Sequence, residues 1–349
     1  MRLFENNKDE HPPAGAIASV THKKFDVVSY FSGCGGLDLG FQGNFTYQSQ
    51  FYEELPFNIL KAYDFDATCK STYEANIGPH FEVKDLTDVN VSEMPSSDIL
   101  IGGFPCQEFS ICGPKGGSTS KRGALFRAMS RYAKHHQPLL VVAENVAHLP
   151  RLNDGADLRR IYRSFSLAGY RASLWKTFAP DFGIPQARNR VILVFVRKDI
   201  KHDPTPPTPK FAGKHRSVEW AISDLMGTTD ESIANQSQYF RAGLAKSGNG
   251  QGDEVSPQHA PGYTVRANAK SRVQFHYELP RRLTVRECAR LQTFPDNFVF
   301  PHAATTNIRQ IGNAVPPVLG HVVAESVRNF LLHPDVQGLR ENNIRRGAK

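Results

Sequence analysis

The stretch FDVVSYFSGCGG (residues 25–36) runs from a short apolar segment into a loop with three glycines. Short apolar runs are typical of buried strands, and glycines let the backbone approach a ligand closely. Further apolar runs follow at Ile59–Tyr63, Asp98–Gly102, Pro138–Ala143 and Arg190–Val196. Helical patterns lie between them at Ala67–Asn76, Leu125–His136 and Leu158–Leu167. This alternation predicts an α/β fold with a doubly wound, mostly parallel sheet.

Composition narrows the class of protein. The chain has 349 residues, and its 42 Lys and Arg against 34 Asp and Glu give a net charge of +8, which permits a nucleic-acid partner. Five scattered cysteines without a CxxC pair argue against a disulfide scaffold and against a structural zinc site. No apolar run approaches the roughly 20 residues of a membrane helix, and the N-terminus lacks the apolar segment of a secretory signal. We therefore expect no metal, no membrane and a cytoplasmic location.

Two composition changes divide the chain. Residues 1–24 are polar and are expected to form either a flexible tail or a loosely docked segment. The proline-rich stretch DPTPPTPK (residues 203–210) is typical of a linker, and the following residues are rich in Gly, Ser, Asn and Gln. Helical periodicity returns at Ala303–Phe330. The pattern predicts one domain from residues 1–198 plus 303–349 and a smaller one from residues 199–302.

Chemically useful residues follow four successive strands. They are the segments SGCGG (32–36), DFD (64–66), GFPCQ (103–107) and ENV (144–146). Because ligands of an open parallel sheet bind at the carboxyl ends of its strands, we expect these segments to form one site. Asp64 could accept hydrogen bonds from a ribose, which suits an adenosine-containing cofactor. The nicotinamide fingerprint fails, since Asp38 stands where its third glycine belongs.

Three kinds of side chain suggest catalysis. They lie in these segments and in the following segment QARNR (186–190). Cys106 follows a proline in a turn, where a thiol could act as a nucleophile, although most single cysteines are packing residues. Glu144 follows a strongly apolar strand, and desolvation there favours the protonated carboxyl. Arg188 and Arg190 alternate with Ala187 and Asn189 and would point to the same side, where two guanidinium groups could hold a phosphate or a base carbonyl.

Six ordered motifs resemble the DNA cytosine-5 methyltransferases of bacterial restriction-modification systems or their orphan relatives. They span residues 25 to 330 and are YFSGCGG (30–36), GFPCQ (103–107), ENV (144–146), QARNR (186–190), RECARLQ with FP (286–295) and QIGNAVPP (310–317). The resemblance implies the class I S-adenosylmethionine-dependent methyltransferase fold. Residues 199–302 would be its target-recognition domain.

The resemblance also implies site residues. The catalytic set would be Cys106 as nucleophile, Glu144 as acid, and Arg188 and Arg190 as contacts to the base and backbone. The S-adenosylmethionine pocket would contain Phe31, Gly33, Cys34, Gly35, Asp64, Phe65, Asp85, Leu86, Gly103, Pro105, Asn313 and Val315. DNA would contact Gln107, Ser110, Cys112, Arg122, Thr264, Arg266, Lys270 and Arg272. Ser29 stands where the family often has Asp, and Cys112 where it often has a small polar residue.

The implied reaction transfers a methyl group from S-adenosylmethionine to C5 of a flipped-out cytosine in a short duplex sequence, leaving S-adenosylhomocysteine. Between residues 257 and 292 seven basic side chains outnumber two acidic ones, which would supply phosphate contacts. We expect a nucleoid-associated monomer that acts on double-stranded DNA, with a restriction endonuclease as a functional partner.

Three alternatives compete with this interpretation. An enzyme that modifies transfer RNA would usually carry a Cys-Phe-Thr run, which the sequence lacks. An inactive DNA-binding relative would be expected to have lost Cys106 or Glu144. A nicotinamide oxidoreductase is disfavoured by Asp38.

Overall fold

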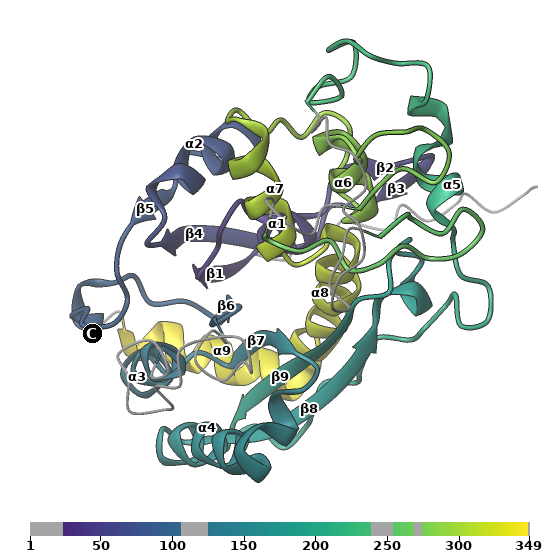
Figure 1. Cartoon of the computed structure of the whole chain (residues 1–349). Coiled ribbons are helices and arrows are strands. Elements are labelled where there is room, and N and C mark those ends of the chain that lie inside the picture. Colours follow the sequence, from purple (N-terminus) through teal and green to yellow (C-terminus); the bar gives the residue numbers. More distant parts are fainter. Residues whose placement is uncertain (1–23, 106–124, 239–253, 269–273, 348–349) are drawn as a thin grey trace, which may run out of the picture.

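The computed structural model describes residues 24–105, 125–238, 254–268 and 274–347. Its main sheet has the order β5-β4-β1-β6-β7-β9-β8, and β2 and β3 form a separate hairpin (Figure 1). The strands are β1 (Phe25–Tyr30), β2 (Phe45–Tyr47), β3 (Gln50–Tyr52), β4 (Phe57–Asp64), β5 (Phe81–Val83), β6 (Ile99–Gly102), β7 (Leu140–Val146), β8 (Tyr170–Phe178) and β9 (Asn189–Arg197). The five predicted strands are all present, with ends that differ from their apolar runs by a few residues.

Strand direction follows the prediction for most of the sheet. Strands β5, β4, β1, β6 and β7 are mutually parallel, whereas β9 is antiparallel to both β7 and β8. The edge strand β8 was not predicted, because its sequence YRASLWKTF interrupts the apolar residues with charged ones. The order reverses beside β1, since β4 follows on one side and β6 on the other. A ligand site is expected at such a reversal.

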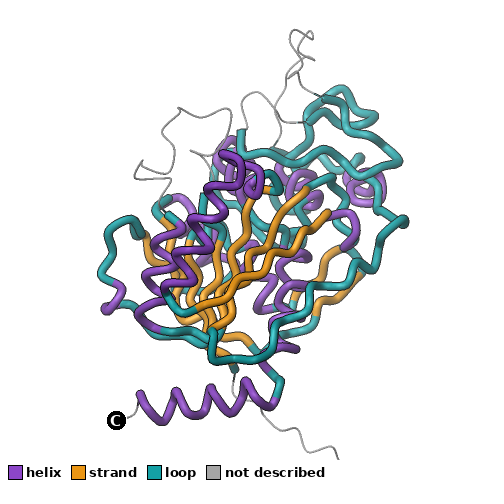
Figure 2. The backbone as a smooth tube through the Cα atoms, turned by 90° about the horizontal axis from the view of Figure 1, so that it is seen from below, coloured by secondary structure: helices purple, strands orange, loops and turns teal. Residues whose placement is uncertain are grey.

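Alternating residues of the strands pack into separate cores on the two faces of the sheet. Val27, Ile99 and Val142 join one cluster, which also contains apolar residues of α1 and α8. Val28 and Leu100 join the other cluster, with residues of α3 and α4. This explains why the strands are almost continuously apolar, and it agrees with the doubly wound architecture seen in Figure 2.

Helices pack on both faces of the main sheet, and others lie near the carboxyl ends of its strands. They are α1 (Gly36–Gln42), α2 (Ala67–Asn76), α3 (Phe126–His136), α4 (Ala156–Leu167), α5 (Val218–Ile222), α6 (Val285–Leu291), α7 (Ala304–Asn313), α8 (Pro317–Leu331) and α9 (Pro334–Gly347). The predicted helices correspond to α2, α3 and α4. Helix α2 begins after Asp66, whose side chain accepts the N–H of Thr68 at 3.0 Å.

Apolar residues of the predicted second domain join the core of the first. Val218, Leu225 and Leu283 belong to the same cluster as Phe25 of β1. Because the two predicted domains share this core, burial does not test the proposed boundaries at residues 199 and 302, which stay a prediction. Of the helices in the described residues, none combines the length and apolar character that a bilayer crossing requires.

Candidate active site

A cavity of about 560 Å³ opens at the carboxyl ends of β1, β4, β6 and β7. This volume lies within the range of about 300–1,000 Å³ that is usual for small-molecule sites. All the residues predicted for the cofactor line it, with the exception of Gly35, and so do Glu144, Arg188 and Arg190. The structure thus brings together segments from both ends of the sequence.

Asp64 fastens the glycine loop to the end of β4. Its Oδ2 accepts the N–H of Gly33 at 2.9 Å, and its Oδ1 accepts the N–H of Asp66 at 2.9 Å. Burial raises the pKa of Asp64, while these N–H donors act in the opposite direction. Above Gly33, at φ +54°, no atom lies within 4 Å of the position that a Cβ would take. The loop therefore presents open backbone to the cavity.

The loop rests on a buried polar group that the sequence did not assign to the site. Asp38 of α1 is fully buried and accepts hydrogen bonds from Ser29 Oγ and Tyr73 Oη, both at 2.7 Å. Burial raises the pKa of Asp38 to about 6. Gly35, at φ +92°, lies directly above Tyr73, because an added Cβ would come within 3.0 Å of that ring. Asp38 therefore holds the Tyr73 side chain, against which the glycine loop packs.

The opposite wall is formed by the turn after β5. The Asp85 carboxylate accepts the N–H of Thr87 at 2.9 Å, and Leu86 is buried. Arg131 of α3 donates to the Leu86 and Thr87 carbonyls at 3.0 and 2.7 Å. Beside this wall Phe65 is 71% exposed although it borders the cavity. An apolar ring held in the open at a cavity mouth is suited to stacking on a flat ligand.

Arg188 fixes the segment that carries Asn313 and Val315. Its guanidinium group is buried and donates to the carbonyl oxygens of Gly312 at 3.2 Å and Ala314 at 2.9 Å. Burial lowers the pKa of Arg188 to about 9. The side chain therefore holds this end of the cavity through backbone contacts, which differs from the direct contact to a base that the resemblance implies.

Glu144 and Arg190 form an ion pair at the other end of the cavity. Glu144 lies within β7, two residues before its end, whereas the sequence placed it after the strand. In the β7–β9 register Glu144 is opposite Ile192, so Arg190 is its diagonal neighbour. Arg190 Nε lies 2.7 Å from Glu144 Oε1, and the two side chains are 15% and 12% exposed.

This ion pair leaves hydrogen-bonding capacity on the carboxyl group. Glu144 Oε1 is buried, and within the described residues no donor reaches it with hydrogen-bond geometry. A Cβ on Gly103 would lie 3.4 Å from Glu144 Oε2, so the glycine keeps this side of the carboxyl open. Because Glu144 lines the cavity, the Oε2 side of its carboxyl can bind a ligand that enters there.

Asn145 positions the backbone that leads to Cys106. Its Nδ2 donates to the Phe104 carbonyl at 2.9 Å, and its side chain is buried. The sequence motif ENV contains Asn145 but gave it no role. An amide at the end of an apolar strand was the available signal, because a buried amide needs partners.

The structure places Thr264 and Arg266 near the cavity edge. Thr264 Oγ1 donates to the Ala187 carbonyl at 2.7 Å, and Arg266 is exposed. The backbone of Arg266 touches Gly312, where an added Cβ would lie 2.3 Å from the Arg266 carbonyl carbon.

The positive excess of residues 257–292, from which we expected phosphate contacts, includes arginines that are buried or paired within the protein. Arg286 is fully buried and donates to backbone carbonyls, including that of Pro295 at 2.8 Å. Arg290 is paired with Asp224 and Asp296, and Arg281 is paired with Glu287. These arginines hold the segment together. A count of charges in the sequence could not reveal their burial.

Seven predicted residues lie outside the described part of the chain. They are Cys106, Gln107, Ser110, Cys112, Arg122, Lys270 and Arg272.

Comparison with known proteins gives a consistent result. The chain is 31% identical to the Type II methyltransferase M.FnuDI of Fusobacterium nucleatum, covering 87% of this chain and 94% of the relative. It is 32% identical to the Type II methyltransferase M.MthTI of Methanothermobacter thermautotrophicus, covering 88% and 98%. Among solved structures, the Dnmt2 methyltransferase of S. pombe shares the fold with a TM-score of 0.63 at 18% identity, covering 88% and 98%. The model of the C-5 cytosine-specific DNA methylases matches residues 25–329, and the chain belongs to this family.

Proposed function

We propose that this DNA cytosine-5 methyltransferase modifies a flipped-out cytosine within a short duplex sequence through a covalent bond to Cys106. The observation that supports this most strongly is the orientation of Glu144 in the cavity. Its carboxyl is shielded from solvent, paired with Arg190 and open to a ligand on the side of Gly103. The segment Gly103–Pro105 in the same wall leads directly to Cys106.

The residues of the cavity fit S-adenosylmethionine. Open backbone at Gly33, the exposed ring of Phe65 and the carboxylates of Asp64 and Asp85 suit a nucleoside with free hydroxyl groups. Asn313 and Val315 would lie toward the methionine end. When bound, S-adenosylmethionine supplies the methyl group and becomes S-adenosylhomocysteine.

The protein side chains would activate the base. The Cys106 thiolate adds to C6 of cytosine, which makes C5 nucleophilic and moves negative charge toward N3. Glu144 in its protonated form donates to N3, a kind of general acid catalysis that typically contributes about 10²–10⁴-fold in rate. Arg190 holds the carboxyl in place at 2.7 Å and stabilises the carboxylate that remains. After methylation a base takes the C5 proton, the C5–C6 double bond re-forms and the thiolate leaves.

Recognition of the DNA sequence would come from residues 199–302. Arg266 lies beside Gly312 at the edge of the cavity and Thr264 contacts Ala187, so a base extruded into the site would come from a duplex held against this segment. The Type II names of the relatives support a restriction endonuclease as a functional partner.

The test uses duplexes with 5-fluorocytosine, whose fluorine cannot leave as a proton does. Bisulfite sequencing of plasmid from expressing cells first identifies the methylated sequence. The full-length protein with S-adenosylmethionine should then form a denaturant-resistant complex with the substituted duplex. Cys106→Ala should form none while retaining DNA binding, and Glu144→Gln should form it much more slowly. A complex formed equally by Cys106→Ala would refute the nucleophile.

A further inference from the structure

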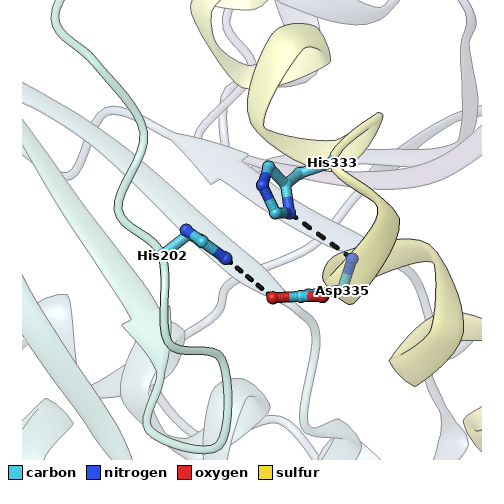
Figure 3. A group of neighbouring side chains, drawn as sticks. All are labelled: His202, His333 and Asp335. Atoms are coloured by element: carbon cyan, nitrogen blue, oxygen red, sulfur yellow. Dashed lines mark hydrogen bonds and ion pairs between the residues drawn. The ribbon is translucent and has the colours of Figure 1, made fainter.

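Two histidines and an aspartate gather on the surface, and none of the three lines the active-site cavity. His202 comes from the loop after β9, while His333 and Asp335 come from the junction of α8 and α9 (Figure 3). His202 Nε2 lies 2.8 Å from Asp335 Oδ2, and the two imidazole rings have centroids 3.8 Å apart. One ligand atom from each residue lies within 4.8 Å of the other two.

The loop that carries His202 is held by one guanidinium group. Arg171 of β8 donates to the backbone carbonyls of Ile200 and His202, and its Nε donates to Asp203 Oδ1 at 2.8 Å. The loop backbone on both sides of the imidazole is therefore fixed before any ligand arrives. Such preorganisation lowers the cost of forming a binding site.

The other two groups lie at the start of α9 and just before it. Asp335 lies in the first turn of the helix, and its backbone N–H points at His333 Nδ1 at 3.4 Å. This contact is long for a hydrogen bond, so it yields easily to a stronger partner. In Figure 3, His202 and His333 lie near Asp335 and come from two different segments. The three side chains thus border a common space between two segments.

We propose that His202, His333 and Asp335 form a binding site for a divalent metal ion of the zinc class, with water in the remaining coordination positions. Two imidazoles and a carboxylate are ligands that Zn²⁺ accepts. At ordinary zinc–ligand distances the ligand atoms of a tetrahedral site lie about 3.4 Å apart. The observed separations of up to 4.8 Å would close by rotation of the exposed Asp335 and the half-buried His202 and His333 side chains.

A metal here would join the loop after β9 to the first turn of α9. Farther along this helix, Arg340 Nη2 lies 2.8 Å from Asp98 Oδ2, and its guanidinium lies over the Phe25 ring. The metal would add a second attachment at the beginning of the helix. We therefore expect it to stabilise the packing of α9 without contributing to methyl transfer.

Another surface histidine provides a matched control. His259 pairs with Glu219 at 3.0 Å, so it offers one imidazole and one carboxylate without the second imidazole. If a histidine–carboxylate pair were sufficient to bind the metal, this pair would bind it equally well.

The test is a calorimetric titration of the full-length chain with Zn²⁺ alone, applied to wild type, His202→Gln, His333→Gln, Asp335→Asn and His259→Gln. Glutamine at position 202 and asparagine at position 335 keep hydrogen-bonding groups, and the Tm of each variant without metal checks that it folds. Wild type and His259→Gln should share a saturable binding event that each of the other variants weakens at least tenfold, since even groups that merely orient metal ligands are worth about 10- to 100-fold. Saturating Zn²⁺ should raise the Tm of wild type and of the control His259→Gln. It should not raise the Tm of the other three variants.

Two outcomes would overturn the proposal. One is the absence of a saturable event in wild type. The other is an event of equal affinity in wild type and in both His202→Gln and His333→Gln, because binding shared by these variants must occur elsewhere on the chain. Either result would leave only the contact between His202 and Asp335 at this position and would not affect the proposed methyl transfer.

Discussion

Replacing Asp38 with asparagine should change how stability depends on pH. Asp38 is fully buried, and burial raises its pKa from 3.8 to about 6. The folded state therefore holds this proton more tightly than the unfolded state. Its contribution to stability is complete below pH 3.8 and is lost as pH rises through about 6. At higher pH the folded protein carries the cost of a buried carboxylate, which a neutral amide at this position would not have.

The size of the effect follows from the two pKa values. The difference between a pKa of 3.8 and one of about 6 corresponds to about 3 kcal/mol, and about 1.4 kcal/mol of this is expressed between pH 5 and pH 8. An amide accepts through one atom only, so Asp38→Asn loses one of the hydrogen bonds from Ser29 and Tyr73, at a cost of about 1 kcal/mol that does not depend on pH. Relative to wild type, the variant should gain about 1.4 kcal/mol from pH 5 to pH 8.

Urea denaturation of both proteins across this range measures the difference directly. Groups that titrate equally in both proteins cancel. His80 Nε2 lies 3.0 Å from Tyr73 Oη and has a pKa lowered by burial, so the pair is also compared in a His80→Gln background. Two results would refute a raised pKa of Asp38. The difference in unfolding free energy between the two proteins could stay constant from pH 5 to pH 8, or the variant could become less stable relative to wild type as pH rises.

Two further predictions concern the walls of the cavity, and a third concerns DNA binding. Arg188→Met should lower the unfolding free energy by about 3 kcal/mol or more in urea denaturation, since buried carbonyls that include those of Gly312 and Ala314 lose their donor; an unchanged value would contradict this role. Asn145→Ala should cost about 1–3 kcal/mol by unpairing the Phe104 carbonyl and should slow formation of the 5-fluorocytosine complex; a fast complex would show that Asn145 does not position that segment. DNA affinity should fall steeply with salt in a filter-binding assay, and Arg266→Gln should reduce the slope by about one; an unchanged slope would exclude a phosphate contact by Arg266.

The sequence predicted the architecture well where local pattern and burial agree. Continuous apolar runs located β1, β6 and β7, because parallel strands covered on both faces need no polar alternation. The same criterion missed β8, an edge strand in which polar and charged residues interrupt the apolar ones. It also ended β7 too early, since Glu144 belongs to the strand despite its charge. A charged residue at a strand end gives no local sign of whether the ladder continues beyond it.

The sequence predicted which residues lie at the site better than it predicted what each residue does there. Strand ends and motifs gathered the cofactor residues around one cavity, because the carboxyl edge of a sheet is a property of topology. Roles depend on partners from distant segments. Arg188 binds the carbonyl of Gly312, 124 residues away, and Asp38 binds Tyr73, 35 residues away. Neither contact leaves a periodic signal in the sequence.

Buried polar side chains connect the segments that form the cavity. Gln186 Nε2 donates to the Leu291 carbonyl at 2.7 Å, and Gln292 Nε2 donates to the Ile311 carbonyl at 2.6 Å. With Arg188, these amides tie the segment before β9 to α6 and to the end of α7, where Asn313 lies. β9 follows this segment directly and carries Arg190 beside Glu144, so one continuous stretch of chain joins the Asn313 end of the cavity to the Glu144 end. Loss of a tie at Arg188 should therefore disturb both ends together, whereas loss of Glu144 should affect the base end alone.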